Sequence, residues 1–199
     1  MKTLVNNLAF RHAYQGFFLL LMIAIPNITL GMTTLYNNQT GLTFTKLESW
    51  GVIAINLIIF YLTYLWAKSE GLMTRFRLDL KDAKAIIWGF LTIFLMGVIG
   101  SNLMLLTHTN YHAELQKTLT TTPILPVTIG MITTAFLQEI LFRKWIFTWL
   151  APYSKTAVLV STGLFCLFHM PTNLAYLTLY IGMGLALSMV YQKRENLSA

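Results

Sequence analysis

Charged residues are scarce in this chain of 199 residues, of which only 11% are Asp, Glu, Lys or Arg. A soluble globular domain usually carries about 25% of these residues. Hydrophobic residues make up 56% of the sequence, and the mean hydropathy is +0.62. This balance excludes an ordinary soluble domain and predicts an integral membrane protein in contact with the lipid bilayer.

Cysteine is nearly absent, since Cys166 is the single one in the sequence. A single cysteine excludes an intramolecular disulfide, and the apolar neighbours of Cys166 indicate a small packing residue. Acidic residues are also few, because 7 Asp and Glu face 14 Lys and Arg, for a net charge of +7. The basic residues gather between apolar segments, which is typical of cytoplasmic loops and argues against nucleic acid as a partner.

Uncharged runs long enough to cross a bilayer recur along the chain, each near the 20 or so residues that a membrane helix needs. The 37 uncharged residues between Lys155 and Lys193 are enough for two short spans. Pro171, in HMPTN at 169–173, marks the break between them because the residue before a proline disfavours helix. We therefore predict an all-α, polytopic membrane bundle of about six transmembrane helices, at residues 17–35, 50–67, 85–107, 123–142, 155–170 and 173–191.

Lys and Arg are distributed unequally between the two sides of such a bundle. One set of alternate loops and tails holds twelve of them, and the other set holds only Lys46 and Lys117. Positive residues favour the cytoplasmic side, so both termini are expected there, in a multi-pass protein of a cell membrane.

No repeat or composition change divides the chain, so we expect a single membrane domain over 1–199. Its two-helix N-terminal part would cover 1–75, and its core would cover 76–199. The basic segment 71–84 either lies on anionic headgroups or is an ordinary cytoplasmic loop.

Glu139 is the acidic residue that falls inside a predicted span. A charge near the middle of a membrane costs about 2.5–3.5 kcal/mol. Arg143 is four residues later, so the two side chains share a helical face and can pair. The alternative is that both residues only end the span, with Arg143 and Lys144 as its cytoplasmic anchor. The neighbouring polar residue, Gln138, favours a functional site.

His169 ends the fifth predicted helix, where a histidine on its own is more often structural than catalytic. A short loop, 144–154, makes the fourth and fifth helices neighbours, so Glu139 and His169 are candidates for activating water together. Zinc catalysis normally needs three protein ligands. We therefore expect neither a metal nor another cofactor, and the HTNYH stretch at 108–112 is only a weak ligand signature in an outer loop.

Two short motifs resemble those of the CPBP (Abi) family of intramembrane proteases. QEILFR, at 138–143, is similar to that family's Glu-Glu-x-x-x-Arg motif, and FCLFH, at 165–169, matches its Phe-x-x-x-His motif. The family includes CAAX prenyl endopeptidases and bacterial proteins implicated in bacteriocin self-immunity. The resemblance extends over about 76–199 and implies a helical bundle with a cavity open to the cytoplasmic side.

The resemblance also implies a role for each matching residue. Glu139 and Arg143 stand at the supporting pair, Phe165 lines the cavity, and His169 orients the attacking water. Gln138 stands where the family has its catalytic Glu, and an amide cannot act as a general base at neutral pH. The loss of a positioned acid or base typically costs about 10²–10⁴ in rate.

The family's third motif, His-x-x-x-Asn, does not occur before Ala199, so we expect a truncation relative to the family. The function that the sequence favours is a CAAX-type endopeptidase, with impaired activity, acting on a peptide or a prenylated protein. The alternative is a non-catalytic immunity or binding protein on the same fold. A small transporter in which Glu139 carries a proton is disfavoured, because paired broken helices and inverted repeats are not evident.

Overall fold

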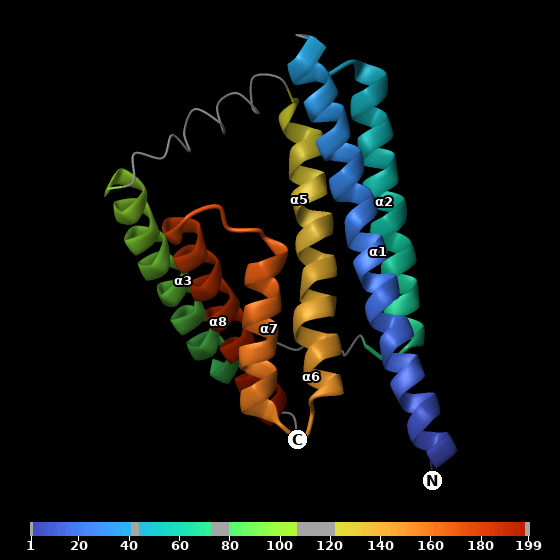
Figure 1. Ribbon diagram of the computed structural model, residues 1–199, viewed down its shortest axis with the longest axis vertical. Helices are drawn as coiled ribbons and strands as arrows, with labels where there is room; N and C mark the ends of the chain where they lie inside the picture. The colour runs from blue at the N-terminus through green and yellow to red at the C-terminus, as the bar shows by residue number, and fades with distance from the viewer. Residues whose placement is uncertain (1, 41–43, 73–79, 107–121, 198–199) are drawn as a thin grey trace. The chain divides into compact units, whose positions relative to one another are not determined.

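The computed structural model describes residues 2–40, 44–72, 80–106 and 122–197, and all regular structure in these ranges is helical (Figure 1). The HTNYH stretch and residues 73–79 of the basic segment lie outside the described residues. The elements are α1 (Lys2–Thr40), α2 (Lys46–Ser69), α3 (Leu80–Leu106), α5 (Ile124–Gln138), η1 (Glu139–Trp145), α6 (Ile146–Trp149), α7 (Ser154–Phe168) and α8 (Leu174–Leu197).

Five helical segments are long and apolar enough to cross a membrane: Ala9–Thr33, Lys46–Ser69, Ile87–Met104, Ile124–Trp149 and Leu174–Lys193. Helix α7, the fifth predicted span, has only 15 residues. At 1.5 Å per residue it is about 22 Å long, shorter than a hydrocarbon core of about 30 Å. The predicted break at 169–173 is where α7 ends and α8 begins. The prediction of an all-α, multi-pass membrane bundle is therefore confirmed. Five of the six predicted spans are long enough to cross a membrane, and α7 is the short one.

The described helices belong to two compact units. The first takes α1, α2 and α5 from Met1–Met73 and Asn110–Leu141, and the second takes α3, α6, α7 and α8 from Thr74–Thr109 and Phe142–Ala199. The chain passes from the first unit to the second inside η1. A single domain divided near residue 75, and the cytoplasmic side for both termini, stay predictions.

Helix α2 begins at a capping box of the Thr-x-x-Glu type. The backbone N–H of Glu48 donates to Thr45 Oγ1 at 3.2 Å, and the backbone N–H of Thr45 donates to Glu48 Oε2 at 2.7 Å. Two N–H groups that the first helical turn leaves unbonded are thus satisfied. This start lies four residues before the predicted span at 50–67.

The three helices of the first unit meet at Gly130 of α5. A Cβ on Gly130 would lie 3.4 Å from Leu30 of α1 and 3.8 Å from the Asn56 side chain of α2. The absence of a side chain lets the backbones approach, as small residues do between membrane helices. Asn56 is fully buried, and its amide donates to the Val52 carbonyl of the preceding turn at 2.9 Å.

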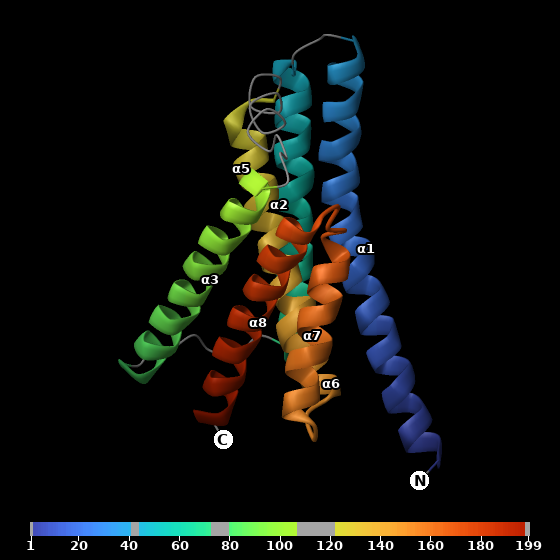
Figure 2. The same cartoon turned by 60° about the vertical axis from the view of Figure 1, so that its left-hand side comes forward.

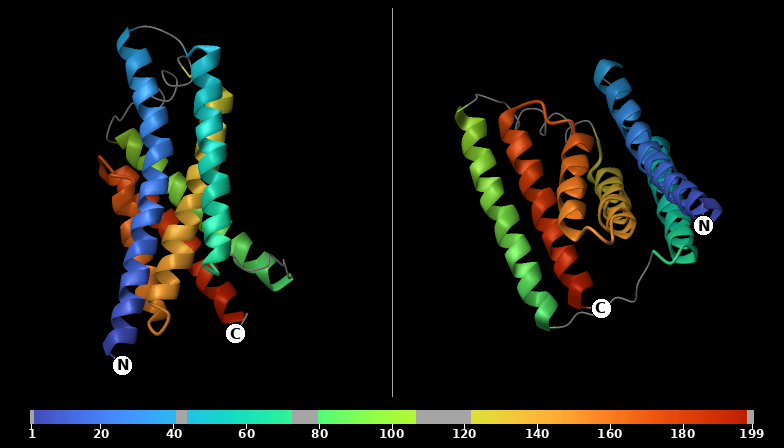
Figure 3. Two further views of the ribbon diagram at one scale, coloured as in Figure 1. Left: turned by 90° about the vertical axis from the view of Figure 1, so that its right-hand side faces the viewer. Right: turned by 60° about the horizontal axis from the view of Figure 1, so that its bottom comes forward.

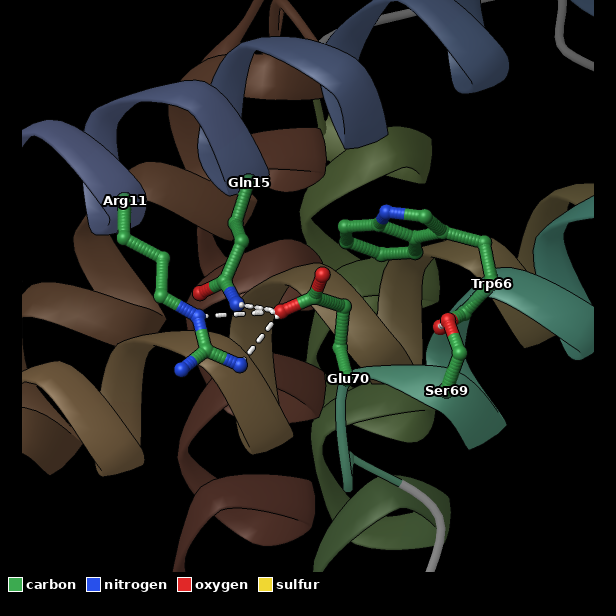
Figure 4. A network of polar contacts seen from close by, with 5 residues as sticks. All are labelled: Arg11, Gln15, Trp66, Ser69 and Glu70. Atoms are coloured by element: carbon green, nitrogen blue, oxygen red, sulfur yellow. Dashed lines mark hydrogen bonds and ion pairs between the residues drawn. The ribbon is translucent and has the colours of Figure 1, made fainter.

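A polar network joins the start of α1 to the end of α2 (Figure 4). Arg11 donates to Glu70 Oε2 from Nε at 3.1 Å and from Nη2 at 2.7 Å, and Gln15 donates to the same oxygen at 2.7 Å. These hydrogen bonds, first from Arg11 and then from Gln15, lower the pKa of Glu70 below its usual value. The network fixes one end of this helix pair.

Helices α3 and α8 of the second unit pack antiparallel, and α8 also packs on α7 (Figures 2 and 3). A Cβ on Gly89 would lie 2.6 Å from Cγ2 of Val190, and Gly182 lies against Met96 about two turns further along the contact. Both glycines therefore allow close helix approach. On the α7 side, a Cβ on Gly184 would lie 3.3 Å from the ring of Phe165, so the absence of a side chain at Gly184 leaves room for that ring.

We predict that Glu70→Gln lowers the free energy of unfolding at neutral pH by up to about 1 kcal/mol, the range of partly exposed ion pairs. A group whose pKa is lowered by folding contributes stability above its unfolded pKa and loses it as the pH falls through its folded pKa. The difference between wild type and variant in detergent melts should thus shrink as the pH falls below about 4.5, the usual pKa of a glutamate, and vanish once the pH is below the lowered pKa of Glu70 in the folded protein. A difference that persists at lower pH would contradict this origin.

Candidate active site

The first predicted motif spans the end of α5 and the π-helical segment η1. Gln138 is the last residue of α5 and is buried, whereas Glu139 opens η1 and is exposed. Arg143, in the same segment, is only 1% exposed. Short π-helical segments shift the register of a helix by one residue and are frequent at functional sites. The pairing of Glu139 with Arg143 stays a prediction.

Arg143 packs against the second motif. Its guanidinium carbon lies 4.6 Å from the ring centre of Phe165 in α7 and 6.0 Å from that of Phe142. The two phenyl rings meet edge to face, with centres 5.6 Å apart. A guanidinium over an aromatic face is worth about 0.5–2 kcal/mol, more where water is excluded. The basic residue of the first motif is thus held by the aromatic residue of the second.

Two buried serines link η1 to α7 and α8. Ser161 donates from its hydroxyl to the Phe142 carbonyl at 2.6 Å, and Ser188 donates to the Ser161 hydroxyl at 3.0 Å. Both serines are fully buried. These hydrogen bonds tie the Phe142–Arg143 turn to α7 and α8 within the second unit, and the sequence analysis did not single out either serine.

His169 is the C-cap residue of α7, and its ring is fixed by the helix that it ends. Its Nδ1 lies 2.8 Å from the Phe165 carbonyl oxygen. A carbonyl can only accept, so Nδ1 carries the hydrogen and donates it, which leaves Nε2 of the neutral ring as the acceptor. The Phe165 carbonyl is one of the last four of α7, which have no partner in the helix ladder. This arrangement aims one basic nitrogen of His169 away from the helix end.

Aromatic rings surround the imidazole of His169. The ring centre of Phe165 lies 4.3 Å away, that of Tyr180 in α8 4.5 Å away, and that of Phe168 5.9 Å away. Tyr180 is tilted by 30° to the imidazole and is the main neighbour that sequence reasoning missed. It is one of nine tyrosines, and no motif spacing distinguishes it.

Met170, directly after His169, has a left-handed backbone with φ of 43°. This conformation ends α7 and turns the chain toward α8, whose first turn is capped by Asn173, which accepts from the Tyr176 N–H at 3.0 Å. The left-handed backbone conformation costs a non-glycine residue about 1–2 kcal/mol. Such outliers are concentrated at functional sites.

The structure thus brings together three of the five predicted site residues, Arg143, Phe165 and His169, in the second unit. Gln138 and Glu139 belong to the first unit, so the expected action of Glu139 and His169 on one water stays a prediction.

Comparison with known proteins bears on the same residues. Residues 120–199 match the family model described as type II CAAX prenyl endopeptidase Rce1-like. The C-terminal part of this chain is similar to the Rce1-like endopeptidases. The resemblance that the two motifs predicted is confirmed, since both lie in the Rce1-like segment.

A curated relative extends the similarity beyond that segment. The UPF0177 protein YvdC of Lactococcus lactis subsp. lactis (strain IL1403) is 27% identical over 192 residues, which cover 92% of this chain and 72% of the relative. No solved structure matches the chain.

Metal-binding side chains do not cluster in the part of the chain that the structure describes, where no group of three or more His, Cys, Asp or Glu could hold an ion. The side chains that the two motifs supply are the amide of Gln138, the carboxylate of Glu139, the guanidinium of Arg143 and the imidazole of His169. The expected absence of a metal and of another cofactor stays a prediction.

We predict that Arg143→Ala lowers the free energy of unfolding by at least about 2 kcal/mol, as large-to-small changes at buried sites do. Arg143→Lys should recover only part of the loss, because an ammonium group lacks the planar face that stacks on Phe165. Thermal melts in detergent measure both changes, with the exposed Lys155→Ala as control. If Arg143→Ala leaves the melting temperature unchanged, the result would contradict the contact of Arg143 with Phe165.

We predict that Met170→Gly raises the free energy of unfolding by up to about 1 kcal/mol, because glycine adopts positive φ without the Cβ penalty. The matched control is Met131→Gly in α5, an exposed helical position where glycine costs about 1 kcal/mol. Opposite shifts of the two melting temperatures are expected. A decrease at both positions would show that Met170 is not strained in the folded protein.

Proposed function

We propose that this chain is an intramembrane endopeptidase of the CAAX type, in which Glu139 and His169 activate the attacking water. The fold belongs to a multi-pass membrane protein, and the Rce1-like match covers both motif-bearing segments. The observation that carries the proposal is the hydrogen bond of His169 Nδ1 to the Phe165 carbonyl, since it leaves Nε2 to accept a hydrogen bond from water.

The proposed reaction is hydrolysis of one peptide bond. Glu139 takes a proton from water as the oxygen attacks the carbonyl carbon, and His169 Nε2 holds that water by accepting its second hydrogen. When the C–N bond breaks, Glu139 returns the proton to the leaving nitrogen, and the carboxylic acid product then gives its remaining proton to the amine, so that a carboxylate and an ammonium group result. Arg143 acts indirectly in this scheme, through its contact with Phe165, whose carbonyl fixes His169.

Gln138 lowers the expected rate. A carboxylate stands at this position in the family that the motifs resemble, and the buried amide of Gln138 cannot take a proton. The replacement of a general base lowers the rate of the reaction by a factor of about 10²–10⁴. Glu139, at the next position, is exposed on the surface of the described helices.

The same observation favours a second candidate, a non-catalytic protein that binds a peptide or a membrane partner, as in bacteriocin self-immunity. A buried amide donates and accepts hydrogen bonds, so Gln138 can hold a peptide backbone without cleaving it. The two candidates differ in turnover and in the effect of restoring a carboxylate.

The test is cleavage of a fluorogenic, prenylated CAAX peptide by the full chain reconstituted in lipid. We expect slow wild-type cleavage, loss of at least about 10²-fold with Glu139→Gln or His169→Ala, and a gain with Gln138→Glu. Glu70→Gln and His12→Ala are matched controls, since they make related changes in helices α1 and α2, and should retain the wild-type rate.

The outcome separates the candidates. Cleavage that Glu139→Gln and His169→Ala leave unchanged would contradict the assigned roles. A wild-type protein that binds the peptide without turnover, while Gln138→Glu cleaves it, would identify the binding protein. A Gln138→Glu variant that neither binds nor cleaves would contradict the CAAX-type substrate.

A further inference from the structure

Helices α3 and α8 leave a shallow groove at one end of their contact. Its volume is about 50 Å³, less than that of two water molecules in the liquid. It is lined by Trp88, Gly89 and Thr92 of α3 and by Ala186, Val190 and Lys193 of α8. The groove lies within the second unit and shares no lining residue with the site around His169.

The close helix contact creates this groove. Gly89 faces Val190, where an added Cβ would lie 2.6 Å from Cγ2, so α3 and α8 approach closely at this level. The Thr92 hydroxyl donates to the Trp88 carbonyl at 2.8 Å, which leaves its methyl group as the surface of the groove. The floor is therefore apolar and suits a hydrocarbon chain better than a polar ligand.

The charge at the groove end is positive. Lys193 lines the groove, and the exposed Lys84 lies one helical turn before Trp88 on α3. Because α3 and α8 are antiparallel with Gly89 beside Val190, Lys193 lies level with α3 between Lys84 and Trp88. Lys84 and Trp88 are four residues apart on α3, so they share a helical face, and Lys193 lies at a similar level on α8.

Trp at this position also indicates the depth in the bilayer. Tryptophan prefers the headgroup level, and basic side chains near it attract anionic lipid by about 1 kcal/mol each. Trp88 is 65% exposed and opens the apolar span Ile87–Met104, as expected for a residue at the interface. An apolar groove below two ammonium groups matches an acyl chain joined to a phosphate.

We propose that this groove is a binding site for an anionic glycerophospholipid. Lys84 and Lys193 bind the phosphate, Trp88 lies beside the glycerol level, and one acyl chain runs over Gly89 and Thr92. The site does not depend on peptidase activity, and it gives the second unit a preference for anionic membrane.

Native mass spectrometry of the full chain tests the site, with phosphatidylglycerol and phosphatidylcholine of identical acyl chains as probes. Wild type should retain one phosphatidylglycerol in preference to phosphatidylcholine. Lys193→Gln should weaken phosphatidylglycerol binding about fivefold, the equivalent of about 1 kcal/mol, and Lys84→Gln should do the same. Lys155→Gln, which removes an exposed positive charge at the start of α7, is the matched control and should change nothing.

A second variant separates a groove from general surface charge. Thr92→Leu keeps all charges and fills the groove, so it should weaken binding of both lipids. Equal retention of the two lipids by wild type, or an equal effect of Lys155→Gln and Lys193→Gln, would overturn the proposal. So would full retention by Thr92→Leu, because charge attraction alone would then explain the binding.

Discussion

Hydrocarbon offers no hydrogen-bond partner, so polar groups in membrane helices must be satisfied by the protein itself. Most polar side chains in these helices do so locally: Asn56, Thr92 and Thr128, for example, donate to the carbonyl four residues earlier. Others join different helices, as Ser161 and Ser188 do at Phe142. Longer-range hydrogen bonds therefore join helices in both units: Arg11 and Gln15 of α1 donate to Glu70 after α2, and Ser161 and Ser188 link η1, α7 and α8.

That constraint also explains the geometry of the candidate site. A helix that ends near the His169 level leaves carbonyls without ladder partners, and the imidazole satisfies one of them. The same hydrogen bond selects the tautomer, while Phe165 and Tyr180 pack against the ring. The left-handed turn at Met170 places this helix end before the start of α8. Helix termination and the proposed chemistry thus depend on the same few atoms.

Small residues have a comparable role in both units. Gly130 lets α1, α2 and α5 approach, and Gly184 leaves room for Phe165 between α7 and α8. Gly89 brings α3 and α8 together and opens the proposed lipid groove at their contact. Since helices in a membrane gain little from hydrophobic burial against each other, close packing at such residues supplies much of their association.

The sequence by itself determined the helical membrane class, the break at Pro171 and the motif residues Arg143, Phe165 and His169, because hydropathy and short spacing act along the chain. Tertiary structure decided that the Arg143 guanidinium lies on Phe165, that Tyr180 packs on His169, and that Ser161 and Ser188 bond to the Phe142 turn. It also made Gln138 buried and its neighbour Glu139 exposed. These features depend on helix rotation and on contacts between distant segments, which no local pattern encodes.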